Sequence, residues 1–515
     1  MDQSLGLKLD PRRDEPIHRQ IFDQVVARIE ARAFPAGFKL PPTRVLAGAL
    51  GAHRNTVARA YAELESAGFV FGSVGRGTFV GDVDGARAQA VDRGAVAVAD
   101  GGQLREMPWN DLVARAAKPE LLARVERYAR RASGPQVINL ARMQPSADLL
   151  PDELMRRCVA RVFAQYGPET LTYAPPEGVL RTRTQIALEL AARGVPATAD
   201  DVLVTSGSQQ ALDLVARSLV NPGDAIMVEA TTYSGALDIF ALAGARVVSV
   251  PSDDDGPELA ALERLTRPDV KALYLMPNGH NPTGRTMSLE RRRQLVLWSR
   301  RVSIPLIEDD YAAGVVLDPP GEPHLRALDG DVIHMSTFSK RLIPAMRIGY
   351  VVAPKELSRS LRSLKRVVDL GTSSILQHAV AEFIERGYLR AHMTKVVREY
   401  RARRDALAAA LTKHLPAECT FQSPRHGLVL WVSLPPSLDV DALYQEALKQ
   451  GVLVSPSPMW SAGLNPRPGV RLAFCAESPE RVAEGARRLG KAVKTLSARA
   501  PRKAEPRSGA VAPFV

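Results

Sequence analysis

Apolar residues recur at helical spacing near the beginning of the chain. Ile17, Ile21, Val25 and Ile29 would share one face of a helix that starts after Pro16. The pattern stops in AFPAGFKLPP, a stretch rich in turn-forming residues. We therefore predict one amphipathic helix followed by a loop.

Two shorter helical patterns follow, joined at a glycine. PPTRVLAGALG begins with prolines suited to a helix start and ends at Gly51, and HRNTVARAYAELESAG carries Val57, Tyr61 and Leu64 on one face. Two short helices joined in this way predict a helix-turn-helix. The next runs, GFVFGS and TFVG, are β-prone and flank the turn VGRG, which predicts a hairpin, the wing of a winged helix.

From about residue 136 the pattern changes, and β-prone apolar runs alternate with helical stretches. Strands separated by helices predict an α/β domain with a mostly parallel sheet and helices on both faces. Ligands of such sheets bind at the carboxyl ends of the strands. The polar clusters that follow the apolar runs are TSGSQQ, EATTY, MPNGHNPTG, IEDDY and STFSK.

The composition fits a globular protein of several domains. At 515 residues the chain could form about two to four domains, its apolar fraction is 45%, and no apolar stretch reaches the ~20 residues that span a bilayer. The first residues do not resemble a signal peptide, so we expect a cytoplasmic protein without a membrane partner. Cys158, Cys419 and Cys475 form no CxxC pair, so neither a disulfide framework nor a metal site is expected.

The net charge of +12 suits a nucleic-acid partner if the basic residues gather on one surface. In a helix-turn-helix, the N-terminal end of the second helix enters the major groove, where Arg and Asn can pair with base edges. That end carries His53, Arg54, Asn55, Thr56 and Arg59. Arg44 and Arg76 are expected to contact the DNA backbone. The alternative is a small helical domain with a basic solvated face.

Residues 334–350 read HMSTFSKRLIPAMRIGY and surround Lys340 with Ser, Thr and one Arg. A lysine that forms a Schiff base with pyridoxal phosphate needs a phosphate cradle, an acid near the pyridine nitrogen and donors for the phenolic oxygen. Side chains that can bind phosphate lie beside the lysine and at the start of the helix after TSG. They are Thr337, Ser339, Arg347, Ser208 and Gln209.

The remaining groups that such a cofactor needs follow other strands. Asp309 ends the IPLIEDD strand, and its carboxylate would keep the ring nitrogen protonated. Tyr311 and Asn281 can reach the ring hydroxyl, and Tyr233 can stack on the pyridine face.

Two resemblances sharpen this interpretation. The stretch KLPPTRVLAGALGAHRNTVARAYAELESAGFVFGSVGRGTFV resembles the winged-helix domain of the GntR family of bacterial regulators, in which serine is common at the position of His53. The series SGSQQ, TTY, NPTG, EDDY and a lysine followed by R-x-G resembles the fold-type I aminotransferases over roughly residues 136–490. That resemblance implies that Lys340 carries pyridoxal phosphate, and it implies a small C-terminal subdomain.

The same resemblance assigns two further residues. Arg471 in GVRLAFC would bind the carboxylate of an amino acid, and Tyr173 in LTYAPPEGVLRTR would reach the phosphate in a neighbouring subunit. A homodimer with shared sites is therefore implied.

The combination of both halves resembles the MocR subfamily of transcriptional regulators, whose members are thought to sense pyridoxal phosphate or an amino compound. In that subfamily the dimer is usually head-to-tail. We expect a winged-helix domain at 10–81, a linker at 82–130, an aminotransferase-like domain at 131–495 and a disordered basic tail at 496–515.

Two motifs leave an enzyme open as the alternative. Many members of the subfamily have an HQxP loop and EDDYDSEF, whereas this chain has PNGHNPTG and EDDYAAGV. Asn281 makes the first loop resemble that of a working aminotransferase, in which Lys340 would act as the base. Steady turnover of an amino acid and a 2-oxo acid would distinguish the enzyme from the regulator.

Overall fold

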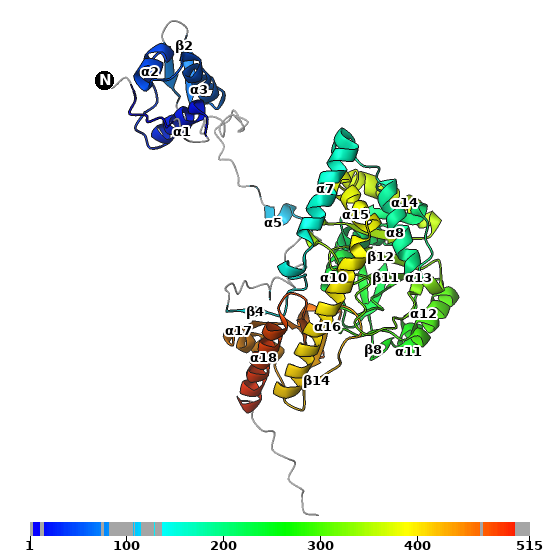
Figure 1. Ribbon diagram of the computed structural model, residues 1–515. Helices are drawn as coiled ribbons and strands as arrows, with labels where there is room; N and C mark the ends of the chain where they lie inside the picture. Colours follow the sequence, from blue (N-terminus) through cyan, green and yellow to red (C-terminus); the bar gives the residue numbers. More distant parts are fainter. Residues whose placement is uncertain are drawn as a thin grey trace, which may run out of the picture. The chain divides into compact units, whose positions relative to one another are not determined.

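The chain folds into two compact units in the computed structural model, Met1–Met107 and Pro108–Val515 (Figure 1). The residues that the structure describes are 4–10, 15–73, 77–81, 107, 109–114, 128, 136–463 and 467–499. Much of the expected linker and the last residues of the chain therefore lie outside the description.

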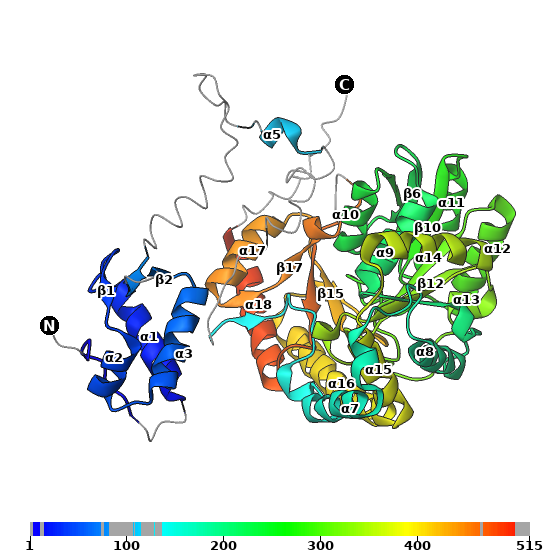
Figure 2. The same ribbon diagram turned by 90° about the horizontal axis from the view of Figure 1, so that it is seen from above.

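The first unit contains the predicted helix-turn-helix and hairpin. Gly51, between the second and third helices, has a positive φ of 62°, a conformation that favours glycine. The short strand β1 was not predicted, and it pairs with β3 beside the hairpin (Figure 2). The elements of this unit are α1 (Ile17–Glu30), β1 (Lys39–Leu40), α2 (Thr43–Leu50), α3 (Arg54–Ser66), β2 (Val70–Ser73) and β3 (Gly77–Val80).

The second unit is built on a seven-stranded sheet within the described residues, in the order β5-β13-β12-β11-β10-β6-β7. All neighbouring strands are parallel except β13, which is antiparallel to both β12 and β5. The prediction of a mostly parallel sheet is therefore confirmed. Its strands are β5 (Val202–Thr205), β6 (Ala225–Glu229), β7 (Arg246–Val250), β10 (Val270–Leu275), β11 (Leu306–Asp310), β12 (Ile333–Thr337) and β13 (Gly349–Val352).

Helices cover both faces of this sheet because the strands are apolar on both sides. In β6, Ile226 and Val228 pack toward the side of α9 and α10, whereas Ala225 and Met227 pack toward α11 and α12. Near β5 and β13 the second face is covered by α7, α8 and α15. The covering helices are α7 (Asp152–Tyr166), α8 (Leu180–Ala192), α9 (Ser208–Leu219), α10 (Ser234–Leu242), α11 (Leu259–Leu265), α12 (Leu289–Val302), α13 (Leu325–Leu328), α14 (Lys355–Asp369) and α15 (Ser374–Glu385).

A smaller sheet of order β14-β15-β18-β17 forms the expected C-terminal subdomain. The long helices α16 and α18 run side by side against it (Figure 1). In addition, β4 pairs with β16, so residues from the start of the second unit join this subdomain. The elements are β4 (Ile138–Asn139), α16 (Tyr388–His414), β14 (Thr420–Phe421), β15 (Val429–Ser433), α17 (Val440–Lys449), β16 (Val452–Leu453), β17 (Ser455–Pro456), β18 (Gly469–Ala473) and α18 (Pro479–Arg499).

Helix α18 extends past residue 495, where we expected the domain to end. Val493 is buried and Leu496 packs against the core, so this part of the chain gains apolar contacts by staying helical. Residues 496–499, assigned to the tail from the sequence, are therefore the end of this helix. The short elements that remain are α5 (Trp109–Leu112), β8 (Ser252–Asp253), β9 (Gly256–Pro257) and the 3-10 helices η2 (Ala147–Leu149), η3 (Gly167–Leu171), η4 (Ala199–Asp201), η5 (Pro344–Met346) and η6 (Ser457–Met459).

The membrane and cysteine expectations can be compared with the described part of the chain. No helix there is both long and apolar enough to cross a bilayer. Cys158, Cys419 and Cys475 are buried thiols outside any disulfide.

The contact between α16 and α18 predicts a sensitive glycine. A Cβ atom on Gly490 would lie 2.6 Å from the backbone carbonyl oxygen of His414, which cannot move away easily. We expect Gly490→Ala to lower the free energy of unfolding of the second unit by about 1–3 kcal/mol, the usual cost of overpacking. Gly330→Ala is the control, because a Cβ there meets no atom within 4 Å. Denaturant unfolding should separate the two variants, and equal stability would contradict the packing argument.

Candidate active site

Lys340 lies just past the carboxyl end of β12, as predicted. Its Nζ donates a hydrogen bond of 2.7 Å to the carbonyl oxygen of Met143. Burial lowers the pKa of Lys340, and the nearby positive charges of Arg471 and Arg347 lower it further. A depressed pKa favours the neutral amine, which is the nucleophilic form.

Arg347 reaches from the same loop to the start of α9. A Cβ atom on Gly207, which precedes α9 and has a φ of +88°, would lie 2.5 Å from Nη2 of Arg347. Nη1 of Arg347 donates to Oγ of Ser339 at 3.2 Å, and Thr337 Oγ1 donates to the same oxygen at 3.0 Å. The structure thus brings three predicted phosphate-binding side chains to one helix N-terminus, where an anion is favoured.

The first turn of α9 carries both predicted residues. Ser208 begins the helix and is half-buried, and Gln209 is exposed. Gln210 is half-buried, and its Oε1 accepts a hydrogen bond of 2.8 Å from the backbone N–H of Ser206. The contact of Gln209 with phosphate stays a prediction.

Asp309 is buried at the end of β11. The hydroxyl of Tyr274 donates to its Oδ2 at 2.7 Å, whereas its Oδ1 has no hydrogen-bond partner among the described residues. Burial raises the pKa of Asp309 to about 7 despite the stabilising bond from Tyr274. A buried carboxylate oxygen without a partner costs free energy unless a ligand supplies the donor.

Tyr311 and Tyr233 lie near this acid and near Arg471, and Asn281 contacts Arg471. The Tyr311 hydroxyl donates to the carbonyl oxygen of Gly279 at 2.8 Å. Burial, followed by the nearby charge of Asp309, raises the pKa of Tyr233 to about 12. Asn281 is buried, and its Oδ1 accepts a hydrogen bond of 3.1 Å from Arg471.

Arg471 holds a buried positive charge in the site. Its Nη2 donates to the carbonyl oxygen of Ala141 at 2.5 Å and to Ser455 Oγ at 3.2 Å, and its guanidinium lies 4.3 Å from the centre of the Trp460 ring. Burial lowers the pKa of Arg471 to about 10. No carboxylate is among the partners found for Arg471 in the described residues, which suits a group that binds a ligand carboxylate.

Tyr173 lies apart from this group. Its side chain is 85% exposed in the single chain. Its predicted role in a neighbouring subunit stays a prediction.

The first unit presents most of the predicted DNA-contacting residues at the start of α3. His53 caps this helix, because its Nδ1 accepts a hydrogen bond of 3.2 Å from the backbone N–H of Asn55. Arg59 is exposed and pairs with Glu63 at 3.1 Å. Arg54 and Arg44 are exposed and Thr56 is half-buried, whereas Arg76 lies outside the described residues.

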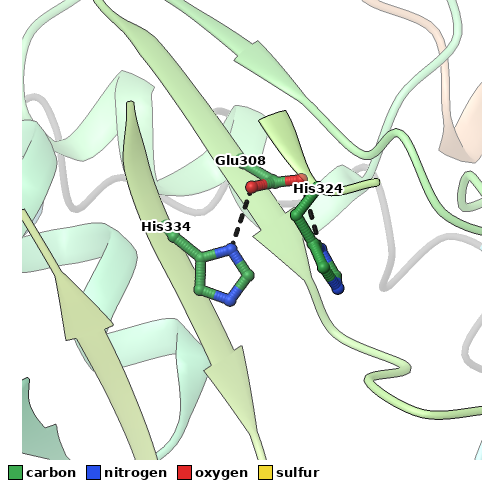
Figure 3. Close-up of side chains that lie close together, drawn as sticks. All are labelled: Glu308, His324 and His334. Carbon is green, nitrogen blue, oxygen red and sulfur yellow. Dashed lines mark hydrogen bonds and ion pairs between the residues drawn. The ribbon is translucent and has the colours of Figure 1, made fainter. Parts of the chain in front are cut away.

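A buried cluster behind the site contains Glu308, His324 and His334, whose ligand atoms lie within 4.8 Å of one another. Figure 3 shows both imidazole rings directed at the two oxygens of Glu308. Each oxygen also accepts a backbone N–H, from Leu325 at 2.9 Å and from Arg326 at 3.1 Å. Because two backbone N–H groups and the His334 ring already bind this carboxylate, with the His324 ring 3.4 Å away, we assign the cluster a structural role in holding the start of α13 against β11.

The comparisons with known proteins agree with both units. Residues 17–80 match the family described as bacterial regulatory proteins, gntR family, and residues 135–489 match aminotransferase class I and II. A probable rhizopine catabolism regulatory protein MocR from Rhizobium meliloti is 31% identical over 497 residues, which are 95% of this chain and 96% of that protein. The chain belongs to the MocR subfamily of GntR-type regulators.

Aminotransferases match the second unit of this MocR-type chain. A 2-aminoadipate transaminase from Thermus thermophilus is 31% identical over 401 residues, which are 77% of this chain and 100% of that enzyme. The crystal structure of LysN, an alpha-aminoadipate aminotransferase from the same species complexed with N-(5'-phosphopyridoxyl)-L-leucine, has a TM-score of 0.70 at 30% identity and covers 76% of this chain and 100% of its own. The second unit therefore has the fold of fold-type I aminotransferases.

Pyridoxal 5'-phosphate is the cofactor of this fold, and the residues present fit it. The unpartnered Oδ1 of Asp309 suits a protonated ring nitrogen, and the Arg347 side chain at the start of α9 suits a phosphate. Lys340 offers an amine of lowered pKa near Arg347 and Arg471. The bound cofactor would supply a carbonyl group that amines can attack and a ring that withdraws electrons.

The buried Asp309 predicts a pH-dependent stability difference. Its pKa in the folded, cofactor-free protein is raised from 3.8 to about 7, so folding is penalised progressively as the pH rises through that range. We expect cofactor-free Asp309→Asn to be more stable than the unmodified protein at high pH, by up to about 4 kcal/mol, with the gain falling toward zero in acid. Denaturant unfolding of both proteins at several pH values would measure this. A gain in stability that does not change with pH would contradict the raised pKa of Asp309.

Proposed function

We propose that this protein is a DNA-binding transcriptional regulator whose second unit senses pyridoxal phosphate or an amino compound that reacts with it. The observation that carries the proposal is the combination in one chain of a helix-turn-helix with an exposed α3 N-terminus and a complete set of groups suited to the cofactor. DNA as partner would put the protein in the cytoplasm.

Each group in the second unit has a proposed task. Lys340 would attach the cofactor, Asp309 would hold its ring nitrogen and Tyr233 would stack on its ring. Arg347, Ser339 and the start of α9 would bind the phosphate. Arg471 and Asn281, which contact each other, would receive the carboxylate of the amino compound.

A homodimer is part of the proposal, and an exposed apolar surface supports it. Leu171 is 68% exposed, Tyr173 85% and Val367 80%. The two segments that carry them are neighbours, because a Cβ on Gly371 would lie 2.8 Å from the carbonyl oxygen of Ala174. Contiguous exposed apolar residues often mark protein interfaces.

An aminotransferase is the second candidate, favoured by the contact between Arg471 and Asn281 and by the full-length match to aminotransferases. The two functions are separable by experiment. Fluorescence anisotropy would measure binding to DNA upstream of the gene, with and without pyridoxal phosphate and amino acids, and a turnover assay would follow amino acid and 2-oxo acid. Specific binding that a ligand shifts supports the regulator, whereas turnover without specific binding supports the enzyme.

Lys340→Ala should remove the response to the cofactor while leaving DNA binding in place. We expect it to lose the visible absorbance of bound cofactor and its trapping by borohydride, because no other side chain is proposed to attach the carbonyl group. Lys355→Ala is the control, since Lys355 is an exposed lysine at the start of α14. Covalent trapping that persists in Lys340→Ala would refute the assignment.

Arg54→Ala should weaken specific DNA binding by about 1–3 kcal/mol if Arg54 reads a base edge. Arg217→Ala in α9 removes the same charge from the second unit and should leave specific binding nearly unchanged. Anisotropy titrations at one salt concentration would compare the two variants. Equal affinities would move the recognition role to another residue.

A further inference from the structure

Tyr274 is fixed on the strand next to the one that carries Asp309. Tyr274 of β10 pairs in register with Ile307 of β11, so Tyr274 and Asp309 lie on the same face of the sheet. The Tyr274 side chain is fully buried, and the ring of Phe240 packs against it edge-on, with 5.7 Å between the ring centres. The tyrosine ring therefore has no room to turn away.

The hydroxyl of Tyr274 selects between the two oxygens of Asp309. It donates to Oδ2 at 2.7 Å, and Oδ1 is the oxygen left without a partner among the residues described. A carboxylate anchored at one oxygen cannot rotate freely about its last torsion. The free oxygen is consequently presented in one direction.

We propose that Tyr274 is a positioning residue, which orients Asp309 toward the ring nitrogen of the cofactor and favours the ionised form of this acid. The inference rests on the proposed binding of pyridoxal phosphate, and it assigns to Tyr274 a role that the sequence motifs do not include.

The surroundings of Asp309 make the bond from Tyr274 important. The titratable neighbours that interact with Asp309 are Asp310, Tyr233, Tyr274 and Tyr311. Burial and the like charge of Asp310 both favour the neutral acid. A hydrogen bond donated to the carboxylate opposes them, so its loss would favour the neutral acid further.

Tyr274→Phe tests this role, and Tyr400→Phe is the matched control. Tyr400 is also fully buried in the core of the second unit, but its hydroxyl has no hydrogen-bond partner among the described residues. The full-length protein would be titrated with pyridoxal phosphate, and the visible absorbance of the bound cofactor would be followed against pH.

We expect Tyr274→Phe to weaken cofactor binding about tenfold or more, as expected for a hydrogen bond to a charged group. The pH at which the bound cofactor changes its absorbance should also rise, because a ring nitrogen without its proton no longer disfavours protonation of the lysine-linked nitrogen. Tyr400→Phe should change neither quantity.

If Tyr274→Phe behaves like Tyr400→Phe while the unmodified protein binds pyridoxal phosphate, the role of Tyr274 is refuted and the proposed function stands. If the unmodified protein binds no pyridoxal phosphate, both are refuted. A double-mutant cycle guards against a general loss of structure, because Tyr274→Phe should have little further effect on cofactor binding in an Asp309→Asn background. Fully additive effects would overturn the inference.

Discussion

The backbone comes very close to itself at Gly207 and Gly349. This contact brings the N-terminus of α9 next to the loop between β12 and β13, which carries Lys340 and Arg347. A Cβ atom on Gly349 would lie 2.7 Å from the backbone carbon of Gly207, so neither the helix start nor the strand could come this close with a larger residue. The contact arises because β13 lies between β5 and β12. Because α9 follows β5, the neighbour of β13, Arg347 just before β13 can reach the N-terminus of α9.

Two ionisable side chains in the site have no partner of opposite charge among the hydrogen bonds described. Lys340 is half-buried and Asp309 is buried, and desolvation shifts the pKa of each toward its neutral form. Neither is paired with the other in the hydrogen bonds described. A stability-optimised core would pair or replace such groups, whereas a site that receives an aldehyde, a ring nitrogen and a phosphate needs them unpaired.

The sequence predicted the elements and the strand ends better than the contacts between side chains. Helical periodicity and the glycine at residue 51 are local signals, and the rule on strand ends brings Lys340 and Asp309 together without knowledge of the sheet order. The insertion of an antiparallel β13 depends on long-range pairing, which no local pattern specifies. The bond of Gln210 to Asp369 and the bond of Tyr274 to Asp309 each join segments that are distant in the sequence.

The backbone at residues 141–143 contacts two side chains of the site. The carbonyl oxygens of Ala141 and Met143 accept hydrogen bonds from Arg471 and Lys340, the two groups proposed to take the carboxylate and the cofactor. A cofactor attached at Nζ of Lys340 would take the amine that now donates to Met143, whereas Arg471, whose Nε has no partner among the described residues, can bind a ligand while it keeps the bond to Ala141. These residues follow β4 near the N-terminal end of the second unit, and the first unit precedes them in the sequence. Ligand binding can change DNA affinity only through a difference between two states, and release of the Met143 carbonyl is a difference that attachment at Lys340 would create.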